Sequence, residues 1–443
     1  MNTEKLAEAI YHSNPLDSER AGQSAIEGIV DYLAVSYQTK SEKEMMTLKQ
    51  IVLEQGGNPT GYLIGSHLHA TRSQAALFNG FQAHLLDYDD VHSDVRGHPS
   101  AVILSALFAV GEPEMHGKRF LAAYVVGVEI MARLGEAMNP THYLKGWHST
   151  ATLGVIAAAG AVAYLRKYSP RLIAETMSLA ATQSAGLRLQ FGTVIKPLHV
   201  GIAAKNAVES ADWIGMGMHS NPDFLTGFFE VYAETNVPDL TVNWGKTWRI
   251  VTPGLWFKQY PFCSAAAHGA DAAAFLHQTY GLTDQDIESV RICFPPDGDS
   301  ALIHHDPETG EEGRFSIEYI VWLALTGKPL SFASFESKPI PPSWRASLQK
   351  VNRITDATIK PSKEALPKGR FTIVTVTATN GNVLSKRIDT PKGSPGNPLT
   401  KSQLKTKLLH AIGDEARAEQ LIEAVHSLPI STLGVFQEAD CKS

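Results

Sequence analysis

The chain has 443 residues, of which 44% are hydrophobic and 19% charged, so it is long and apolar enough to build at least two packed domains. This composition excludes a disordered or fibrous protein. The formal net charge is −6 and no segment gathers a run of basic residues, which argues against a nucleic-acid partner.

Helical patterns dominate residues 3–255, where apolar side chains recur at spacings of three and four. One helix places Leu77, Phe81 and Leu85 on a single face and ends close to Asp87. Further helices are expected over Ser100–Gly111, Arg119–Met138, Thr150–Lys167, Arg171–Ala185 and Gly201–Gly217. Two of them are hydrophobic almost all round, which is typical of helices inside a large bundle or a subunit interface.

The pattern changes after Pro261 to one that is typical of an α/β unit. A strand is predicted over Ile287–Phe294, a helix over Phe315–Leu325, and a hairpin over Phe371–Ala378 and Val383–Ile388 around Asn380-Gly381. A hinge rich in proline and glycine follows over residues 391–398. Helical spacing then returns over Ser402–His426, and we expect this segment to pack back on the helical part of the chain.

The apolar segments predict a protein that is neither exported nor inserted in a membrane. Residues 1–9 mix charged and small apolar side chains, without the apolar core that a signal peptide needs. The longest apolar stretch, residues 151–165, is shorter than the roughly 20 residues that cross a bilayer. We therefore expect a cytoplasmic protein in which this stretch is a buried helix.

The three cysteines, Cys263, Cys293 and Cys441, are too far apart in sequence for a CxxC metal site or a disulfide framework. Three thiols could still meet in space around an iron–sulfur cluster. Isolated cysteines are more often ordinary core or surface residues, and we favour that interpretation.

The densest group of titratable side chains follows the helix that ends near Asp87. Its members are Asp87, Asp89, Asp90, His92, Asp94 and His98. They do not form a calcium loop, because Val91 and His92 occupy positions where such a loop needs an oxygen ligand and a glycine. A transition-metal site, a solvated loop that caps the next helix, and an acid and base pair remain open. The third interpretation rests on imidazole, which titrates near neutral pH and whose tautomer a neighbouring carboxylate can fix.

A second candidate, His148, precedes the alanine-rich helix, with Ser149 or Thr150 as the helix cap. Anions are favoured at such a helix N-terminus. A single histidine there is more often a structural hydrogen-bonding group, so His148 alone is a weak signal. Ser149 does not indicate a hydrolase, because the GxSxG sequence is missing.

Lys196 and Lys258 each stand close to a proline, where we expect an extended or turning chain. Two lysines on two rigid turns suit a bound carboxylate, although an isolated lysine is usually solvated surface. Arg188, within residues 186–192, is a weaker candidate for substrate binding. No dinucleotide-binding glycine motif and no Walker A sequence is present.

These segments, in this order, resemble the MmgE/PrpD family, which includes 2-methylcitrate dehydratases, cis-aconitate decarboxylases and iminodisuccinate epimerase. The resemblance rests on DYDD (87–90), HPS (98–100), GWHST (146–150), FGT (191–193), KPLHVG (196–201), KQYP (258–261) with His268, FSIEY (315–319), PKG (391–393) and NPL (397–399). Each motif is modest alone. Together they are specific, because they extend across nearly the whole chain.

The resemblance implies a mainly α protein with two domains. Residues 1–262 together with 400–443 would form a large all-helical domain, and residues 263–399 a smaller α/β lid domain inserted before its last helix. The active site would lie between the two domains. The resemblance also implies a homodimer, and it implies that neither a metal nor an organic cofactor takes part.

The residues of the family's site carry over to matching positions: Asp87, His98, His148, Lys196, Lys258 and Tyr319. In this site Asp87 would orient an imidazole and Tyr319 would donate to the substrate. The chain departs from the decarboxylase branch at two positions, because Val91 replaces a Thr and Cys263 replaces a His. The second change counts against decarboxylation, since that reaction must return a proton to carbon.

The predicted reaction is the removal or return of a proton on a carbon next to a carboxylate. Lys196 and Lys258 would bind the carboxylate as negative charge spreads onto its oxygens, and His98 and His148 would transfer the proton. The first candidate reaction is epimerisation or β-elimination of a substituted succinate. Dehydration of 2-methylcitrate, decarboxylation of cis-aconitate and a non-catalytic helical binding protein are the alternatives. In each enzymatic case the partner is a small di- or tricarboxylate.

Overall fold

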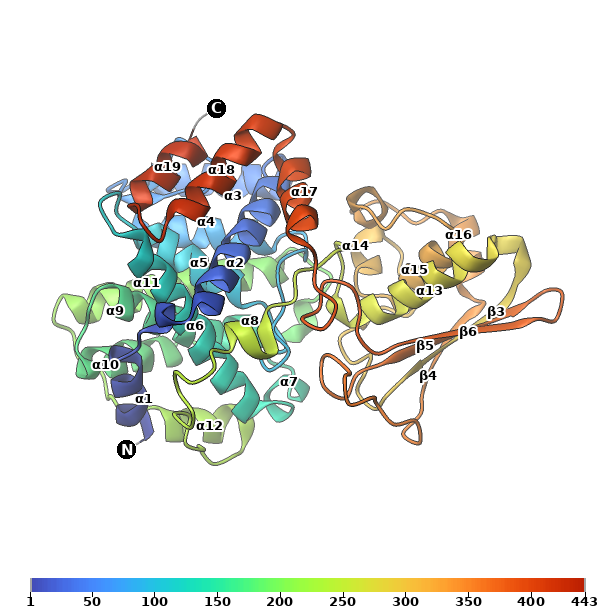
Figure 1. Cartoon of the computed structure of the whole chain (residues 1–443), viewed down its shortest axis with the longest axis horizontal. Helices are drawn as coiled ribbons and strands as arrows, with labels where there is room; N and C mark the ends of the chain where they lie inside the picture. Colours follow the sequence, from blue (N-terminus) through green and yellow to red (C-terminus); the bar gives the residue numbers. More distant parts are fainter. Residues whose placement is uncertain (1, 442–443) are drawn as a thin grey trace. The chain divides into compact units, whose positions relative to one another are not determined.

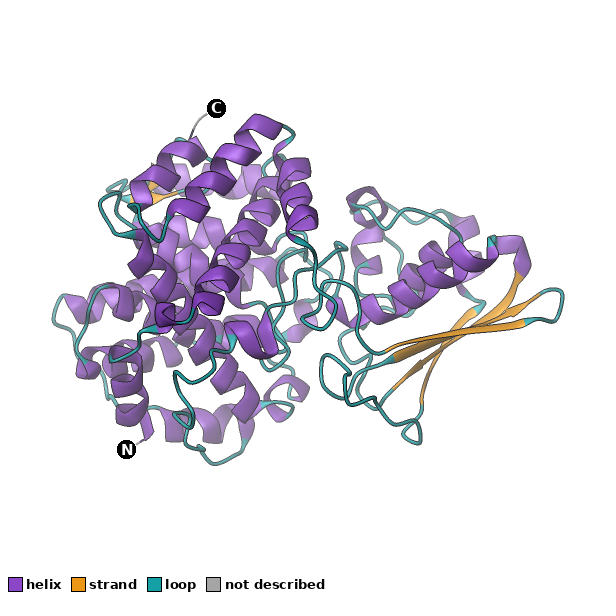
Figure 2. Ribbon diagram, viewed as in Figure 1, coloured by secondary structure: helices purple, strands orange, loops and turns teal. Residues whose placement is uncertain are grey.

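The computed structural model describes residues 2–441, which fold into two compact units. The first unit is built from the chain up to Leu189, from Val194–Leu255, and from Thr400 onward. The second unit comprises Gln190–Thr193 and Trp256–Leu399. The predicted fold class is confirmed, because the first unit is mainly helical and the second combines helices with a four-stranded sheet (Figures 1 and 2).

The first unit is a bundle of helices with a short antiparallel hairpin of β1 (Gly61–Tyr62) and β2 (His69–Ala70). In chain order its helices are α1 (Asn2–Tyr11), α2 (Glu19–Gln38), α3 (Lys43–Gln55), α4 (Arg72–His84), α5 (Pro99–Val110), α6 (Gly117–Met138), α7 (Thr141–Leu144), α8 (Ser149–Thr152), α9 (Gly154–Leu165), α10 (Pro170–Ala181), α11 (Ile195–Gly215), α12 (Leu225–Ala233), α17 (Lys401–Ile412), α18 (Glu415–Ser427) and α19 (Leu433–Cys441). No helix in the described part of the chain combines the length and the apolar character needed to cross a bilayer.

Helices α5 and α9 form the centre of this bundle. Every residue of α5 is buried, and in α9 only Tyr164 is partly exposed, which confirms two helices that are hydrophobic all round. The single helix predicted over residues 150–167 is wrong, because α8 and α9 meet at Leu153. The hydroxyl of Thr152 donates to the carbonyl oxygen of His148 at 3.2 Å, and this type of back-bonding often bends helices.

Helix α11 begins at Ile195, six residues before the predicted start at Gly201. The expectation of an extended chain at Lys196 was therefore wrong. Pro197 lies in the first helical turn, where backbone N–H groups have no acceptor within the helix, so a proline does not interrupt it. As a result, Lys196 is held by a rigid helix rather than by a turn.

The C-terminal segment returns to the first unit, as predicted, but as separate helices. Gly413 has a left-handed φ of 75° and ends α17 before α18 begins. Helix α17 packs on α2 and buries the Lys407 ammonium, which lies 2.7 Å from Asp31 Oδ1 and donates to the Tyr88 carbonyl oxygen at 3.0 Å. The segment is thus joined to α2 and to the chain that follows α4.

The second unit contains a mixed sheet in the order β4-β3-β5-β6. Its strands are β3 (Ile287–Phe294), β4 (Val351–Thr355), β5 (Thr372–Ala378) and β6 (Val383–Ile388), and its helices are α13 (Ala267–Tyr280), α14 (Gly310–Gly313), α15 (Ile317–Leu325) and α16 (Pro342–Leu348). The predicted strand and hairpin are confirmed as β3, β5 and β6. Strand β4, which pairs in parallel with β3, was missed because its five residues carry no strong alternation.

Helices α4 and α11 cross with their backbones in contact. A side chain at Gly80 would lie 2.8 Å from the Cα of Gly201, and one at Gly201 would overlap the carbonyl oxygen of Leu77. Only glycine permits such an approach. Because α4 ends at His84 and α11 begins at Ile195, this crossing sets the distance between the two helix ends.

We predict that Gly201→Ala destabilises the first unit by about 1–3 kcal/mol, because the added methyl group must push α11 away from α4. Urea unfolding followed by circular dichroism would measure this change. Gly227→Ala in α12 is the matched control, since a side chain there meets no atom within 4 Å and should change stability by no more than about 1 kcal/mol. Equal effects of the two substitutions would contradict a tight crossing.

Candidate active site

The candidate site begins where α4 ends. Asp87 has a left-handed φ of 51°, a conformation that aspartate tolerates better than most residues with a side chain. Its N–H donates to the carbonyl oxygen of His84 at 3.1 Å. This turn directs the chain away from the helix axis and leads into the loop that contains Asp89 and Asp90.

A buried ion pair joins this turn to α11. The Nζ of Lys196 lies 2.6 Å from Oδ1 of Asp87, and both residues are 4% exposed. At this distance the contact is a charge-assisted hydrogen bond, roughly twice as strong as a neutral one. Since water does not solvate either charge, each group depends on the other.

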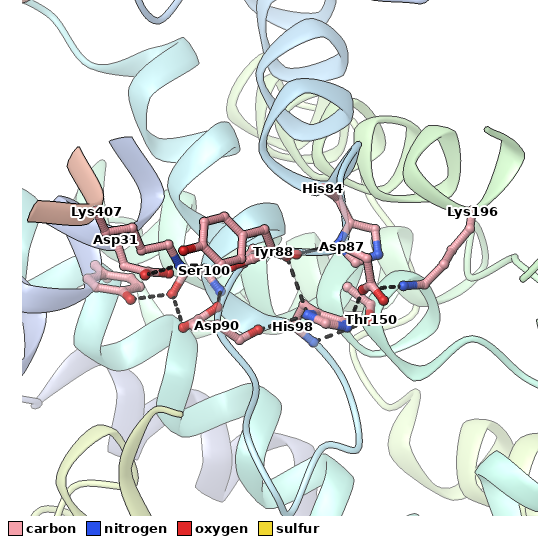
Figure 3. A network of polar contacts seen from close by, with 12 residues as sticks. Asp31, His84, Asp87, Tyr88, Asp90, His98, Ser100, Thr150, Lys196 and Lys407 are labelled. Carbon is pink, nitrogen blue, oxygen red and sulfur yellow. Dashed lines mark hydrogen bonds and ion pairs between the residues drawn. The ribbon is translucent and has the colours of Figure 1, made fainter. Parts of the chain in front are cut away.

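Two imidazoles flank the ion pair, as Figure 3 shows. The Nδ1 of His84 lies 2.9 Å from both carboxylate oxygens of Asp89. The Nδ1 of His98 lies 2.8 Å from the carbonyl oxygen of Asp90, which can only accept, so this nitrogen carries a hydrogen. The other ring nitrogen of His98 is 3.6 Å from Asp87 Oδ1, and the two rings are 4.5 Å apart.

A second group of polar side chains holds the loop on the side opposite Lys196 (Figure 3). The hydroxyl of Ser100 donates to the carboxylate of Asp90 and also contacts the hydroxyl of Tyr124. Burial raises the pKa of Asp90 well above its ordinary value. Lys407 binds the carbonyl oxygen of Tyr88, so the loop is fixed from both α5 and α17.

A third imidazole, that of His148, is also buried, and it stacks on the ring of His84 with the ring centres 5.9 Å apart. The backbone N–H of His148 donates to the carbonyl oxygen of Gly186 at 3.0 Å. Burial and the nearby Lys196 ammonium hold the pKa of His148 well below its ordinary value, so the ring is neutral at pH 7. A neutral imidazole can accept or donate a proton.

One ligand atom from each of His84, Asp87, Asp89 and His98 lies within 4.8 Å of the other three, which is close enough to hold a metal ion. A mixed imidazole and carboxylate set of this kind suits a transition metal. The Lys196 ammonium already provides Asp87 with a cation, and its charge opposes a divalent ion bound to the same carboxylate. The group is a buried cluster in which an ammonium, carboxylates and imidazoles lie close together.

Comparisons with known proteins show the family of the chain. A model of the MmgE/PrpD N-terminal domain matches residues 4–241, and a model of the MmgE/PrpD C-terminal domain matches residues 260–429. The first match alone spans more than half of the chain. The chain belongs to the MmgE/PrpD family. The family resemblance that the motifs predicted is thereby confirmed.

Relatives in this family cover most of the chain. Cis-aconitate decarboxylase of Mus musculus is 26% identical over 353 residues, which are 75% of this chain and 70% of that protein. The protein of the same name from Homo sapiens is 26% identical and covers 75% of this chain and 71% of its own length. Cis-aconitate decarboxylase-like protein oryM of Aspergillus oryzae is 26% identical over 451 residues, 93% of this chain and 90% of that protein.

The structure brings four of the residues predicted for an MmgE/PrpD site into one cluster: Asp87, His98, His148 and Lys196. The Nη1 of Arg188 donates to the Tyr143 carbonyl oxygen at 2.9 Å, and its guanidinium lies 3.9 Å from the centre of the Tyr143 ring. Its role in substrate binding stays a prediction. His92 and Asp94 lie outside the cluster, where both contact Arg249.

Lys258 and Tyr319 belong to the second unit, where both are buried. The hydroxyl of Tyr319 donates to the carbonyl oxygen of Ser334 at 2.9 Å, and burial raises its pKa to about 12. Tyr319 is thus a protonated donor at neutral pH. These two residues remain predicted members of the site.

Sequence reasoning did not assign site roles to His84, Asp89 and His199. His84 lies in the last turn of α4, three residues before Asp87, and His199 lies three residues after Lys196 on α11. Residues at this spacing share a face within one helix, as Lys196 and His199 do on α11, whereas Asp87 lies beyond the end of α4. The signal was therefore present in the sequence, but using it required the correct start of α11.

We predict that Lys196→Met destabilises the protein by about 3–5 kcal/mol, because it leaves the Asp87 carboxylate buried without the ammonium. Asp87→Asn in the same chain should recover much of this loss, and urea unfolding of the two single variants and the double variant would measure the coupling. Lys205→Met is the matched control on α11, because its ion pair with Glu209 is partly exposed and contributes about 0.5 kcal/mol or less. If the effects of Lys196→Met and Asp87→Asn on the free energy of unfolding were additive, the two residues would not be a coupled pair.

Proposed function

We propose that the protein is an enzyme that removes or returns a proton on a carbon next to a carboxylate of a small di- or tricarboxylate. The observation that carries this proposal is the buried Lys196 ammonium, 2.6 Å from Asp87 and surrounded by imidazoles. Removing such a proton places negative charge on the carboxylate oxygens. A fixed cation in a dry site stabilises that charge far better than water does.

The roles follow from the electrostatics of each group. Neutral His148 is suited to accept the proton from carbon, and Lys196 is suited to bind the carboxylate whose charge increases. His98 is the second proton carrier, with Asp87 fixing the orientation of its ring. We assign Lys258 and Tyr319 of the second unit to substrate binding on the basis of the family pattern.

Epimerisation or β-elimination of a substituted succinate is the first candidate reaction, because it needs two acid/base groups and a carboxylate-binding cation, for which His98, His148 and Lys196 are the candidates. Decarboxylation of cis-aconitate is the second candidate, favoured by relatives of that name that match 75% and more of the chain. Val91 and Cys263 stand where the decarboxylase branch carries polar side chains. Both candidates share the carbanion-like intermediate that Lys196 would stabilise.

Proton NMR in D₂O with a panel of polycarboxylates tests the proposal: an enantiopure N-substituted succinate, 2-methylcitrate and cis-aconitate. Deuterium at the α-carbon with loss of optical purity identifies an epimerase, loss of water a dehydratase, and release of CO₂ a decarboxylase. The whole proposal fails if no compound of the panel reacts or exchanges.

We predict that His148→Gln and His98→Gln each lower turnover by about 10²-fold or more, because each removes a proton-transfer group. Circular dichroism should show retained folding in both variants. His410→Gln, an exposed histidine on α17, is the control and should retain full activity. Unchanged turnover in His148→Gln would favour the non-catalytic alternative.

The pH dependence of kcat/KM provides a further prediction. An ordinary imidazole protonates near pH 6.5, whereas the lowered pKa of His148 keeps its base form at more acidic pH. The acid limb of the profile, corrected for substrate ionisation, should therefore lie clearly below pH 6.5. In Lys196→Met the limb should move to higher pH, since one cause of the lowered pKa is removed, and it should stay in place in Lys205→Met. An acid limb at or above pH 6.5 in the wild type would contradict a neutral His148.

A further inference from the structure

The imidazole of His199 is in contact with that of His148. Its partly buried ring is in the first turns of α11, and its Nδ1 faces the Nδ1 of His148 at 3.4 Å. The ring centres are 5.6 Å apart with an angle of 54° between the planes. The rings therefore approach through the edges that carry the Nδ1 atoms. The two imidazoles therefore form a pair that reaches from the buried site to a partly exposed position.

The backbone at Gly186 shapes the space for this pair. Its carbonyl oxygen accepts the N–H of His148, and a side chain at Gly186 would lie 3.2 Å from Nδ1 of His199. Its φ of +123° is also in the region that favours glycine. The close approach of the two rings thus depends on a residue without a side chain.

Two facing nitrogen atoms can share only one hydrogen, so the neutral pair has two arrangements. In the first, Nδ1 of His148 donates to His199, and Nε2 of His148 has a free electron pair and is a base. In the second, Nδ1 of His199 donates to His148, and Nε2 of His148 carries a hydrogen and is an acid. The position of one hydrogen therefore decides which role His148 has.

We propose that His199 is a positioning residue and proton relay that switches His148 between its base and acid forms. This inference rests on the proposed function. As Nε2 of His148 takes the proton from carbon, the hydrogen on its Nδ1 moves to Nδ1 of His199, and the hydrogen on Nε2 of His199 leaves to water. The reverse sequence delivers a proton to carbon. One proton enters and one leaves in each direction.

The charges around the pair favour this relay over storage of the proton. His148 is faced by Lys196, His84, His98 and His199, and burial together with these groups lowers its pKa. Burial and the Lys196 ammonium also lower the pKa of His199. Neither ring keeps a second proton near pH 7. When His148 accepts a proton, another one must therefore leave through His199 to water.

We test the relay with His199→Asn and His199→Ala. An asparagine amide can take the place of Nδ1 and donate or accept a hydrogen bond there. It has no second ring nitrogen from which a proton could leave, so it cannot act as a relay. Both variants should lose about 10²-fold in turnover and in α-carbon deuterium exchange, measured with the compound of the polycarboxylate panel that the wild type converts. Added imidazole should restore part of the loss in His199→Ala and leave the wild type unchanged. His12→Ala, an exposed histidine, is the control with full activity.

The outcomes separate the relay from the proposed function. Full activity of His199→Asn, or a loss in His199→Ala that imidazole does not restore, would overturn the relay while wild-type activity still supports the proposed function. Nitrogen-15 NMR of histidine-labelled protein provides a readout without substrate. The relay predicts that His199→Ala changes the ring nitrogen shifts of His148, and identical shifts in variant and wild type would overturn it.

Discussion

The hydrogen-bonded ion pair between Lys196 and Asp87 is the constraint on which the rest of the first unit depends. Neither charge is tolerated in this interior without the other, so the end of α4 and the start of α11 must meet at one point and one depth. Gly80 and Gly201 allow the two helices to cross closely enough for this meeting. Packing and electrostatics therefore specify the same geometry.

The Lys196 ammonium has two effects that work together. It is the cation that would attract an anionic substrate in the proposed function, and together with burial it lowers the pKa of His148 and His199, which keeps both imidazoles neutral. A site that bound carboxylates through protonated histidines would lose its bases by doing so. Here a lysine provides the positive charge, and the imidazoles of His148 and His199 stay neutral.

Local sequence patterns predicted the elements whose signal is local. Helix α5 and the buried character of α9 were predicted from continuous hydrophobicity, and the hairpin of β5 and β6 from alternation around Asn380-Gly381. The predicted start of α11 was wrong because Pro197 was expected to interrupt the helix. A proline in the first helical turn does not interrupt it. The pairing of His148 with His199 and of Lys407 with Tyr88 joins distant segments, and no periodicity encodes such contacts.

The return of α17 to the first unit has a consequence for biosynthesis. The ribosome completes Trp256–Leu399 before it makes the lysine that binds Asp31 and the Tyr88 carbonyl oxygen. Until then, the nascent polypeptide carries Asp87 and His98 on a loop that lacks one of its supports. The loop that carries Asp87 and His98 therefore gains its last support late in translation, after the second unit has been synthesised.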